Sequence, residues 1–417
     1  MLRDRSNLIF GLLVVFSLAV AACAPALGGQ GAQDSDALEA DPGAEEGASA
    51  GGEVAGDGDQ MVTEDPFEGV RLRFDPRFWP STDFTNHSVD YSEFLSGGPP
   101  PDGIPAIDDP QFDTVDEAGQ WLDPDWPVMF FEWNGDARAY PLTILIYHEI
   151  VNDVVGGQEV ALTFCPLCNA TIAFDRTLPD GTILDFGTTG NLRNSDLVMY
   201  DRQTFSWWQQ FTGEAIVGEL TGTVLEFLPS LIIAWSDFAE NHPEGRVLSR
   251  QTGFSRPYGR NPYEGYDTIT SNPFLFDGVA DGRLPPVERV AAIQIDGVDV
   301  AYPFSLLEEL KVVNDEVAGQ PVVVFWKEGT VSTFGNSSRD TGASAVFLRQ
   351  VGERVLTFRA VDGEFEDQET GSTWSVFGEA IAGPLAGSQL TQVVSADHFW
   401  FAWAAFRPDT IIWTPPS

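Results

Sequence analysis

The residues most capable of chemistry lie within Ala139–Arg176, which contains the pair His148-Glu149 and two cysteines, Cys165 and Cys168. The only other cysteine of the chain is Cys23, near the N-terminus. Two thiols three residues apart can act as a redox dithiol or bind a soft metal ion. A disulfide across so short a loop would stabilise the fold by only about 2 kcal/mol, which argues against a purely structural role.

Adding His148 to Cys165 and Cys168 gives a three-ligand metal site with one open position. This composition suits copper or zinc, whereas a closed four-ligand zinc site would need a second cysteine pair, which the sequence lacks. A second hypothesis is a hydrolase or transferase in which Cys165 is the nucleophile and His148 the general base. In a third interpretation, His148 is a core histidine bonded to a backbone carbonyl, and Glu149 faces solvent.

This stretch belongs to the first copy of an internal repeat. Glu132–Pro141 matches Gln294–Pro303, and continuing without a gap aligns Val151-Asn152-Asp153 with Val313-Asn314-Asp315. Later matches pair Asn169–Arg176 with Gly342–Arg349, Asp201, Thr204 and Trp208 with Asp367, Thr370 and Trp374, and Trp235 with Trp400. The sequence therefore predicts a first module at 127–250, a linker at 251–286, and a second, degenerate module at 287–412.

Residues that differ between the two copies are the better site candidates. His148 becomes Leu310, Glu149 becomes Lys311 and Cys165 becomes Lys327, while Cys168 has no counterpart. Arg193-Asn194-Ser195-Asp196 also lacks a match, so we predict that Glu149, Arg193, Asn194 and Asp196 contribute to cofactor binding. Polar residues kept in both copies are expected to hold the shared fold. Among them, Asn152-Asp153 is expected to close a helix and form a turn.

Short strands dominate the predicted secondary structure, so each module is expected to be α+β. Apolar or alternating runs bounded by turn residues predict strands at Val128–Trp133, Glu159–Phe164, Thr171–Phe174, Thr182–Phe186, Leu197–Tyr200 and Ala215–Val217. Leu142–Val151 is apolar nearly all round and predicts a short buried helix after Pro141, with Phe304–Val313 as its counterpart. Trp235–Asn241 predicts a second short helix, which ends before Pro243.

The N-terminus has the features of a targeting segment. Arg3 and Arg5 precede an apolar run at Leu8–Val20, which is short for a membrane span. The run closes on small residues and Cys23, which resembles a bacterial lipoprotein signal with Cys23 as the lipidated residue. Two or three acyl chains would anchor the protein stably. The alternative is an ordinary signal peptide, over residues 1–22, with a chance cysteine at its end.

Residues 23–69 are rich in Gly, Ala, Asp and Glu, which predicts a flexible, self-repelling acidic tether. An irregular lead-in rich in Pro, Asp and aromatic residues follows at 70–126. The net charge of −41 argues against binding to nucleic acid. We therefore expect a cell-envelope protein that faces the periplasm or the cell exterior and contacts the membrane through the lipid on Cys23. The sequence does not identify a protein partner or small-molecule ligand.

The aromatic residues support one further, non-enzymatic hypothesis. Trp207-Trp208 and Trp400–Trp403 would suit a sugar-stacking surface of a cell-surface binding module. Such aromatic residues are more often part of a core, and Trp208 recurs in the second module as Trp374. Glycan or peptide binding that survives loss of both cysteines would favour this hypothesis.

Several spaced motifs resemble the bacterial family catalogued as domain of unknown function (DUF) 3179. They are Arg138–Pro141, His148–Asp153, Cys165–Cys168 and Leu192–Thr204. The resemblance runs from about Gly103 to the C-terminus and implies no activity, because none is assigned to the family. Some members carry threonine in place of the second cysteine. The resemblance therefore gives Cys165 more weight than Cys168 and favours a single-thiol ligand or nucleophile over a dithiol.

Overall fold

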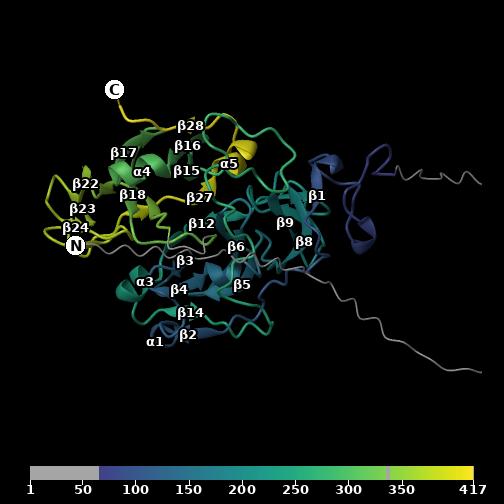
Figure 1. The fold of residues 1–417 in the computed structure, drawn as a ribbon, viewed down its shortest axis with the longest axis horizontal. Helices are drawn as coiled ribbons and strands as arrows, with labels where there is room; N and C mark the ends of the chain where they lie inside the picture. Colours follow the sequence, from purple (N-terminus) through teal and green to yellow (C-terminus); the bar gives the residue numbers. More distant parts are fainter. Residues whose placement is uncertain (1–64, 335–338, 417) are drawn as a thin grey trace, which may run out of the picture. The chain divides into compact units, whose positions relative to one another are not determined.

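The structure is a computed structural model that describes residues 65–334 and 339–416. Residues Thr63–Ser417 fall into one compact unit. The predicted signal peptide, the lipidation site Cys23 and nearly all of the tether lie outside the described residues. Within the described ranges, 28 short strands and five short α-helices confirm the α+β, strand-dominated prediction (Figure 1). No helix in this part of the chain is long and apolar enough to cross a membrane.

The first module contains three antiparallel or mixed sheets. Two strands of the lead-in, β1 (Phe94–Ser96) and β2 (Phe112–Thr114), each add to one of these sheets. The first sheet has the order β13 (Leu231–Ala234), β3 (Pro127–Trp133), β4 (Asp136–Pro141), β14 (Arg246–Leu248) and β2 (Phe112–Thr114). The second has the order β12 (Glu226–Leu228), β7 (Ala170–Asp175), β6 (Gln158–Cys165) and β5 (Ile150–Val155). The third has the order β1 (Phe94–Ser96), β8 (Phe186–Arg193), β9 (Asp196–Asp201), β10 (Trp207–Gln209) and β11 (Glu214–Val217).

The second module repeats these three sheets in the same chain order. The first is β27 (Ser395–Phe399), β15 (Arg289–Ile295), β16 (Val298–Pro303) and β28 (Ile411–Ile412). The second is β17 (Val312–Val317), β18 (Gln320–Lys327), β19 (Ala343–Leu348) and β26 (Thr391–Gln392). The third is β22 (Phe358–Val361), β23 (Glu364–Asp367), β24 (Thr373–Trp374) and β25 (Ala380–Ala382). A hairpin of β20 (Gln350–Val351) and β21 (Arg354–Val355) is added.

The helices are α1 (Val115–Ala118), α2 (Leu142–Leu145), α3 (Trp235–Asn241), α4 (Phe304–Leu310) and α5 (Trp400–Phe406). Two 3₁₀ turns, Pro76–Phe78 and Tyr91–Glu93, belong to the lead-in. The helix predicted at Trp235–Asn241 is confirmed. The predicted helix at Leu142–Val151 is wrong in its second half, because Glu149 adopts a positive φ of 60° and the chain continues as β5. Lys311 does the same at φ 63°, and β17 then begins at Val312.

The strand predictions hold with one exception. Thr182–Phe186 does not form a strand. Its first part makes an isolated bridge between Thr177 and Ile183, and β8 begins only at Phe186. Runs with β-branched and aromatic residues were sufficient to place the other strands, because each is bounded by turn residues.

Asn152 and Asp153 lie inside β5, so their predicted turn role is wrong. The side chain of Asn152 accepts a hydrogen bond from the backbone N–H of Phe186 at 3.0 Å and donates one to its carbonyl at 2.9 Å. In the second module, Asn314 makes the same two bonds with Phe358, each at 2.8 Å. The shared asparagine therefore joins the second and third sheets of each module, which is the structural role its recurrence predicted.

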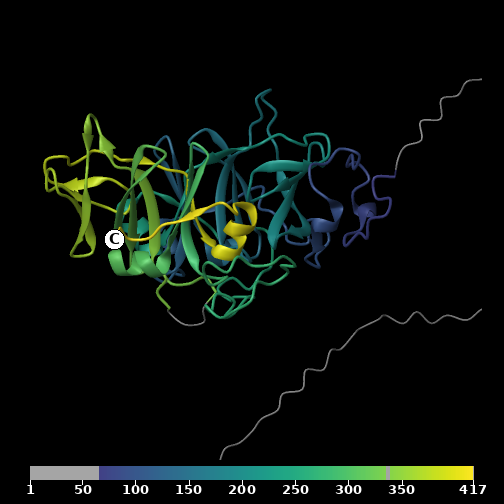
Figure 2. The same ribbon diagram turned by 90° about the horizontal axis from the view of Figure 1, so that it is seen from above.

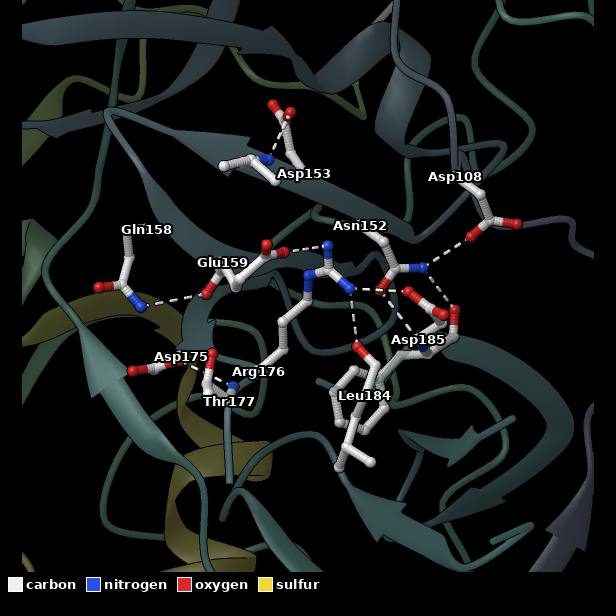
Figure 3. Close-up of polar contacts among 12 residues, drawn as sticks. Asp108, Asn152, Asp153, Gln158, Glu159, Asp175, Arg176, Thr177, Leu184 and Asp185 are labelled. Atoms are coloured by element: carbon white, nitrogen blue, oxygen red, sulfur yellow. Dashed lines mark hydrogen bonds and ion pairs between the residues drawn. The ribbon is translucent and has the colours of Figure 1, made fainter. Parts of the chain in front are cut away.

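Arg176 makes a second repeated link between these two sheets. Its guanidinium donates to the carbonyl of Leu184 at 3.0 Å and also contacts Glu159 and Asp185 (Figure 3). The matching Arg349 donates to the carbonyl of Leu356 at 2.9 Å. Buried backbone carbonyls require such partners.

The first sheet of each module contacts the second sheet of the other module. β27 of the second module contacts β7 of the first, and β13 of the first contacts β19 of the second. Helix α5, which follows β27, lies between the green strands of the second module and the teal strands of the first (Figure 2). Core clusters of buried side chains therefore contain residues of both modules.

Candidate functional site

The two cysteines lie at the turn between β6 and β7. Cys165 is the last residue of β6 and pairs with Ala170 across the hairpin. Cys168 follows the Pro166-Leu167 corner, and its N–H donates to the Cys165 carbonyl at 3.3 Å. Both thiols are free, and only 2% of Cys165 and none of Cys168 is exposed. The turn therefore places both sulfur atoms inside the protein.

Asp196 approaches the thiols from the β8–β9 hairpin. Asn194 and Ser195 form its turn with φ values of 53° and 69°, and Asp196 is the first residue of β9. The Oδ2 atom of Asp196 accepts hydrogen bonds from Gln209 Nε2 at 2.7 Å and from the N–H of Phe211 at 2.9 Å. Oδ1 is buried and has no hydrogen-bond partner in the described part of the chain.

Cys165, Cys168 and Asp196 form one cluster, which we name the thiol–carboxylate group. One ligand atom of each residue lies within 4.8 Å of those of the other two, and all three residues are buried. Metal bonds near 2.0–2.3 Å separate neighbouring ligands of a tetrahedral site by roughly 3.5–4 Å. Small side-chain rotations would therefore bring these three atoms to bonding distance of one ion.

The surroundings of this group disfavour negative charge. Burial raises the pKa of Asp196 to about 7, although hydrogen bonds from Gln209 and Phe211 oppose the shift. Burial, with a smaller effect of the Asp196 charge, raises the pKa of Glu149 to about 8. Burial also raises the pKa values of both thiols. Among the described residues, no basic side chain forms an ion pair with Asp196 or Glu149, so four acidic groups share this region without a compensating cation.

Residues 101–410 match the model of the family DUF3179, whose description is "Protein of unknown function". The chain belongs to the DUF3179 family. The resemblance expected from the motifs is thereby confirmed. Neither a curated protein nor a solved structure gives a match. The thiol–carboxylate group of this DUF3179 protein lies within the matched residues.

His148 lies outside the thiol–carboxylate group. Its ring is fully buried, Nδ1 lies 2.7 Å from the Pro105 carbonyl oxygen, and Nε2 lies 2.6 Å from the Tyr258 hydroxyl. Because a carbonyl can only accept, Nδ1 carries the proton and Nε2 accepts from Tyr258. Both nitrogens therefore already have partners, as in the interpretation of His148 as a core histidine. Burial lowers its pKa to about 4.

The other predicted cofactor-binding residues occupy different environments. Glu149 is buried, with 7% exposed, and its charge couples to Asp196, so it borders the group. Arg193 forms an ion pair with Glu93 at 2.7 Å and lies over the ring of Phe406. Asn194 shapes the turn that delivers Asp196. The structure thus brings Asp196 and Glu149 to the thiols and gives Arg193 and Asn194 supporting positions.

The linker contributes contacts that the sequence did not reveal. The Tyr266 hydroxyl donates to the Leu167 carbonyl, inside the Cys-Pro-Leu-Cys turn, at 2.9 Å. Ser195 Oγ donates to the Phe274 carbonyl at 2.5 Å, next to Asp196. The linker therefore covers the thiol–carboxylate group. In the sequence, the abundance of tyrosine in the linker was the one indication of these contacts.

The second module also forms hydrogen bonds with the same turn. The N–H of Phe399 donates to the Cys168 carbonyl, and the side chain of Asn169 donates to the Asp397 carbonyl, each at 2.9 Å. The tryptophans considered for sugar stacking are core residues: Trp207, Trp208 and Trp400 are fully buried and Trp403 is 6% exposed. The aromatic-surface hypothesis therefore has no exposed tryptophan at these positions.

Proposed function

We propose that the first module binds a borderline transition-metal ion, Zn²⁺ in the first instance, through Cys165, Cys168 and Asp196. The observation that carries this proposal is the convergence of two thiols and a carboxylate oxygen within 4.8 Å, in a buried region. Buried anionic groups are costly unless they are paired or coordinate a metal. A dication would supply the missing positive charge and would bind the deprotonated forms of all three side chains.

The donor atoms favour zinc over copper. Zinc takes thiolate and carboxylate ligands together, whereas Cu(I) prefers the soft sulfur atoms alone. Oδ1 of Asp196, which accepts no N–H or O–H hydrogen bond from the described residues, is available for such a bond, because Gln209 and Phe211 hold Oδ2. Glu149 could supply a fourth ligand or balance charge from its neighbouring position. This donor set replaces the imidazole of His148, considered from the sequence, with the carboxylate of Asp196.

Metal titration of the full chain, purified without affinity-tag metals, tests the proposal. Co²⁺ serves as a visible substitute for Zn²⁺, because thiolate coordination gives an intense charge-transfer absorption. We expect one equivalent to bind, and Cys165→Ser, Cys168→Ser and Asp196→Asn each to lower the affinity by about 100-fold or more. Asp180→Asn, at an exposed loop position, is the control.

His148→Gln separates the two possible donor sets. If Asp196 is the third ligand, His148→Gln keeps the thiolate absorption and the stoichiometry. Loss of binding in His148→Gln with retention in Asp196→Asn would overturn the proposed set. Absence of binding for Zn²⁺, Co²⁺ and Cu(I) alike, together with a reversible disulfide between Cys165 and Cys168 seen by mass spectrometry, would instead indicate a redox dithiol.

A nucleophilic role for Cys165 has less support. Reactive cysteines have lowered pKa values near positive groups, whereas burial raises the pKa of Cys165. Its proposed base, His148, has both ring nitrogens engaged. An activity-based thiol probe that labels Cys165 in the folded, metal-free protein would reverse this assessment.

We further propose that the protein is anchored to the cell envelope by acyl chains on Cys23. The support is the apolar run at Leu8–Val20 followed by small residues and Cys23. Metabolic labelling with an alkyne fatty acid should mark the full-length protein and should fail for Cys23→Ser. Labelling that persists in Cys23→Ser would contradict the assignment.

A further inference from the structure

A second candidate site is a cavity between the two modules, separate from the thiol–carboxylate group. Its volume is about 210 Å³. The first module contributes residues of β7 and β12 together with Phe211, and the second contributes β15, β27 and Trp403 of α5. Figure 1 shows β12, β15 and β27 in neighbouring positions. Neither cysteine nor Asp196 lines this cavity.

Aromatic rings lie next to one of the polar side chains in the cavity wall, that of His398; the other polar residues of the wall are Thr171, Ser230, Gln294, Ser395 and Arg407. The ring centroid of His398 lies 4.5 Å from that of Phe211 and 5.3 Å from that of Trp403. His398 is 3% exposed, and its Nδ1 atom has no hydrogen-bond partner among the described residues. Burying an unpaired polar group costs about 1–3 kcal/mol, so the imidazole is a polar group in need of a partner.

The fold itself does not require a histidine here. The equivalent residue of the first module is Ile233. Ile233 pairs with Val128 of β3, and His398 pairs with Val290 of β15, the residue that the repeat aligns with Val128. Ile233 is fully buried and serves the same packing position with an apolar side chain. The second module, which lacks the thiols, therefore carries a polar feature of its own.

The size and polarity of the cavity define the ligand class. An engineered apolar cavity of about 150 Å³ binds benzene, so this volume admits one ring with a small substituent. The net charge of −41 disfavours anionic ligands, and Arg407, the charged side chain in the wall, already faces Asp299 at 3.9 Å. A hydroxyl group can donate to or accept from an imidazole nitrogen.

We propose that this cavity binds a small neutral ring compound of the phenol class, whose hydroxyl hydrogen-bonds to His398. Phenol is the probe, and toluene and benzoate are the comparison ligands. Titration calorimetry on the full chain should show that phenol binds more tightly than toluene and that benzoate binds more weakly than phenol. Cys165→Ser should leave these affinities unchanged, so the result is independent of the proposed metal site.

Two variants locate the binding. His398→Phe keeps an aromatic ring and should weaken phenol binding on the order of tenfold, the loss of one hydrogen bond, while leaving toluene unchanged. Ala396→Leu extends a side chain into the cavity and should abolish binding of both. Circular dichroism establishes that each variant is folded. Phenol affinity equal to wild type in Ala396→Leu, or no phenol binding to the wild type at millimolar concentration, would overturn the proposal.

Discussion

His148 Nε2 accepts a hydrogen bond from the hydroxyl of Tyr258 at 2.6 Å, and Tyr258 also contacts Thr252 Oγ1 at 2.6 Å. The same imidazole donates to the Pro105 carbonyl in the lead-in. His148 therefore joins three segments, the lead-in, the first module and the linker, through one neutral ring. Its isolation from the thiols follows from this role, because neither nitrogen is left for another partner.

The first prediction concerns acid stability. The pKa of His148 falls from its usual 6.5 to about 4, so the folded protein resists protonation that the unfolded chain accepts. Its contribution is complete above pH 6.5 and is lost as the pH falls toward 4. His148→Gln should be less stable than wild type at pH 8, and this gap should shrink between pH 6.5 and 4. Chemical denaturation at several pH values measures it, and a gap that stays constant would contradict the assignment.

The second prediction concerns Glu149 in the metal-free protein. Its pKa of about 8 lies above the usual 4.5, so folding is penalised once the unfolded chain ionises, and the penalty grows from about pH 4.5 to 8. Glu149→Gln should therefore match wild type at pH 4.5 and exceed it in melting temperature at pH 8. Saturating Zn²⁺ should reduce the difference if the ion compensates the charge. A melting difference that does not change with pH would show that Glu149 does not titrate as the burial implies.

The third prediction uses a matched pair of repeated contacts. Asp201 accepts from Trp208 Nε1 at 2.9 Å, and Asp367 accepts from Trp374 Nε1 at 3.0 Å. Both aspartates also accept from a nearby threonine N–H. Because alanine would leave these buried donors unpaired, Asp201→Ala and Asp367→Ala should each cost about 2–4 kcal/mol of unfolding free energy.

Neither variant should change the metal stoichiometry of the protein that remains folded. This separates the shared aspartates, which hold the scaffold, from Asp196. A loss of metal binding in Asp367→Ala, with the fold intact, would argue for a site that the second module completes.

The fourth prediction concerns the linker as a cover. The Tyr266 hydroxyl donates to the Leu167 carbonyl and accepts from the N–H of Phe274 at 3.2 Å. Tyr266→Phe removes both bonds and should raise the rate at which a disulfide reagent modifies Cys165 and Cys168 several-fold, because local opening becomes easier. Tyr263→Phe is the control, since no hydrogen bond of its hydroxyl occurs in the described chain. Equal rates in the two variants would contradict a covering role.

Local sequence pattern was enough to predict most strands and the α3 helix, and residues shared by the two copies, such as Asn152 with Asn314 and Asp201 with Asp367, make the same hydrogen bonds in each module. The local pattern failed at Glu149, where a positive φ ends the helical turn. An apolar run alone does not distinguish a helix from the start of a buried strand. The cysteine turn was recognisable from spacing. The partnership with Asp196 was not, because the two meet only through the folding of separate hairpins, and neither was the contact of Tyr266 with Leu167.

The amide of Asn169 bonds to the carbonyl of Asp397, a residue 228 positions later in the chain. The second module, which has no cysteine, thus helps to hold the turn that carries the thiols of the first. Replacements in β27 would then alter the behaviour of sulfur atoms they never touch. The second module is therefore part of the support of the cysteine turn, and its removal would leave the Asn169 amide and the Cys168 carbonyl without these partners.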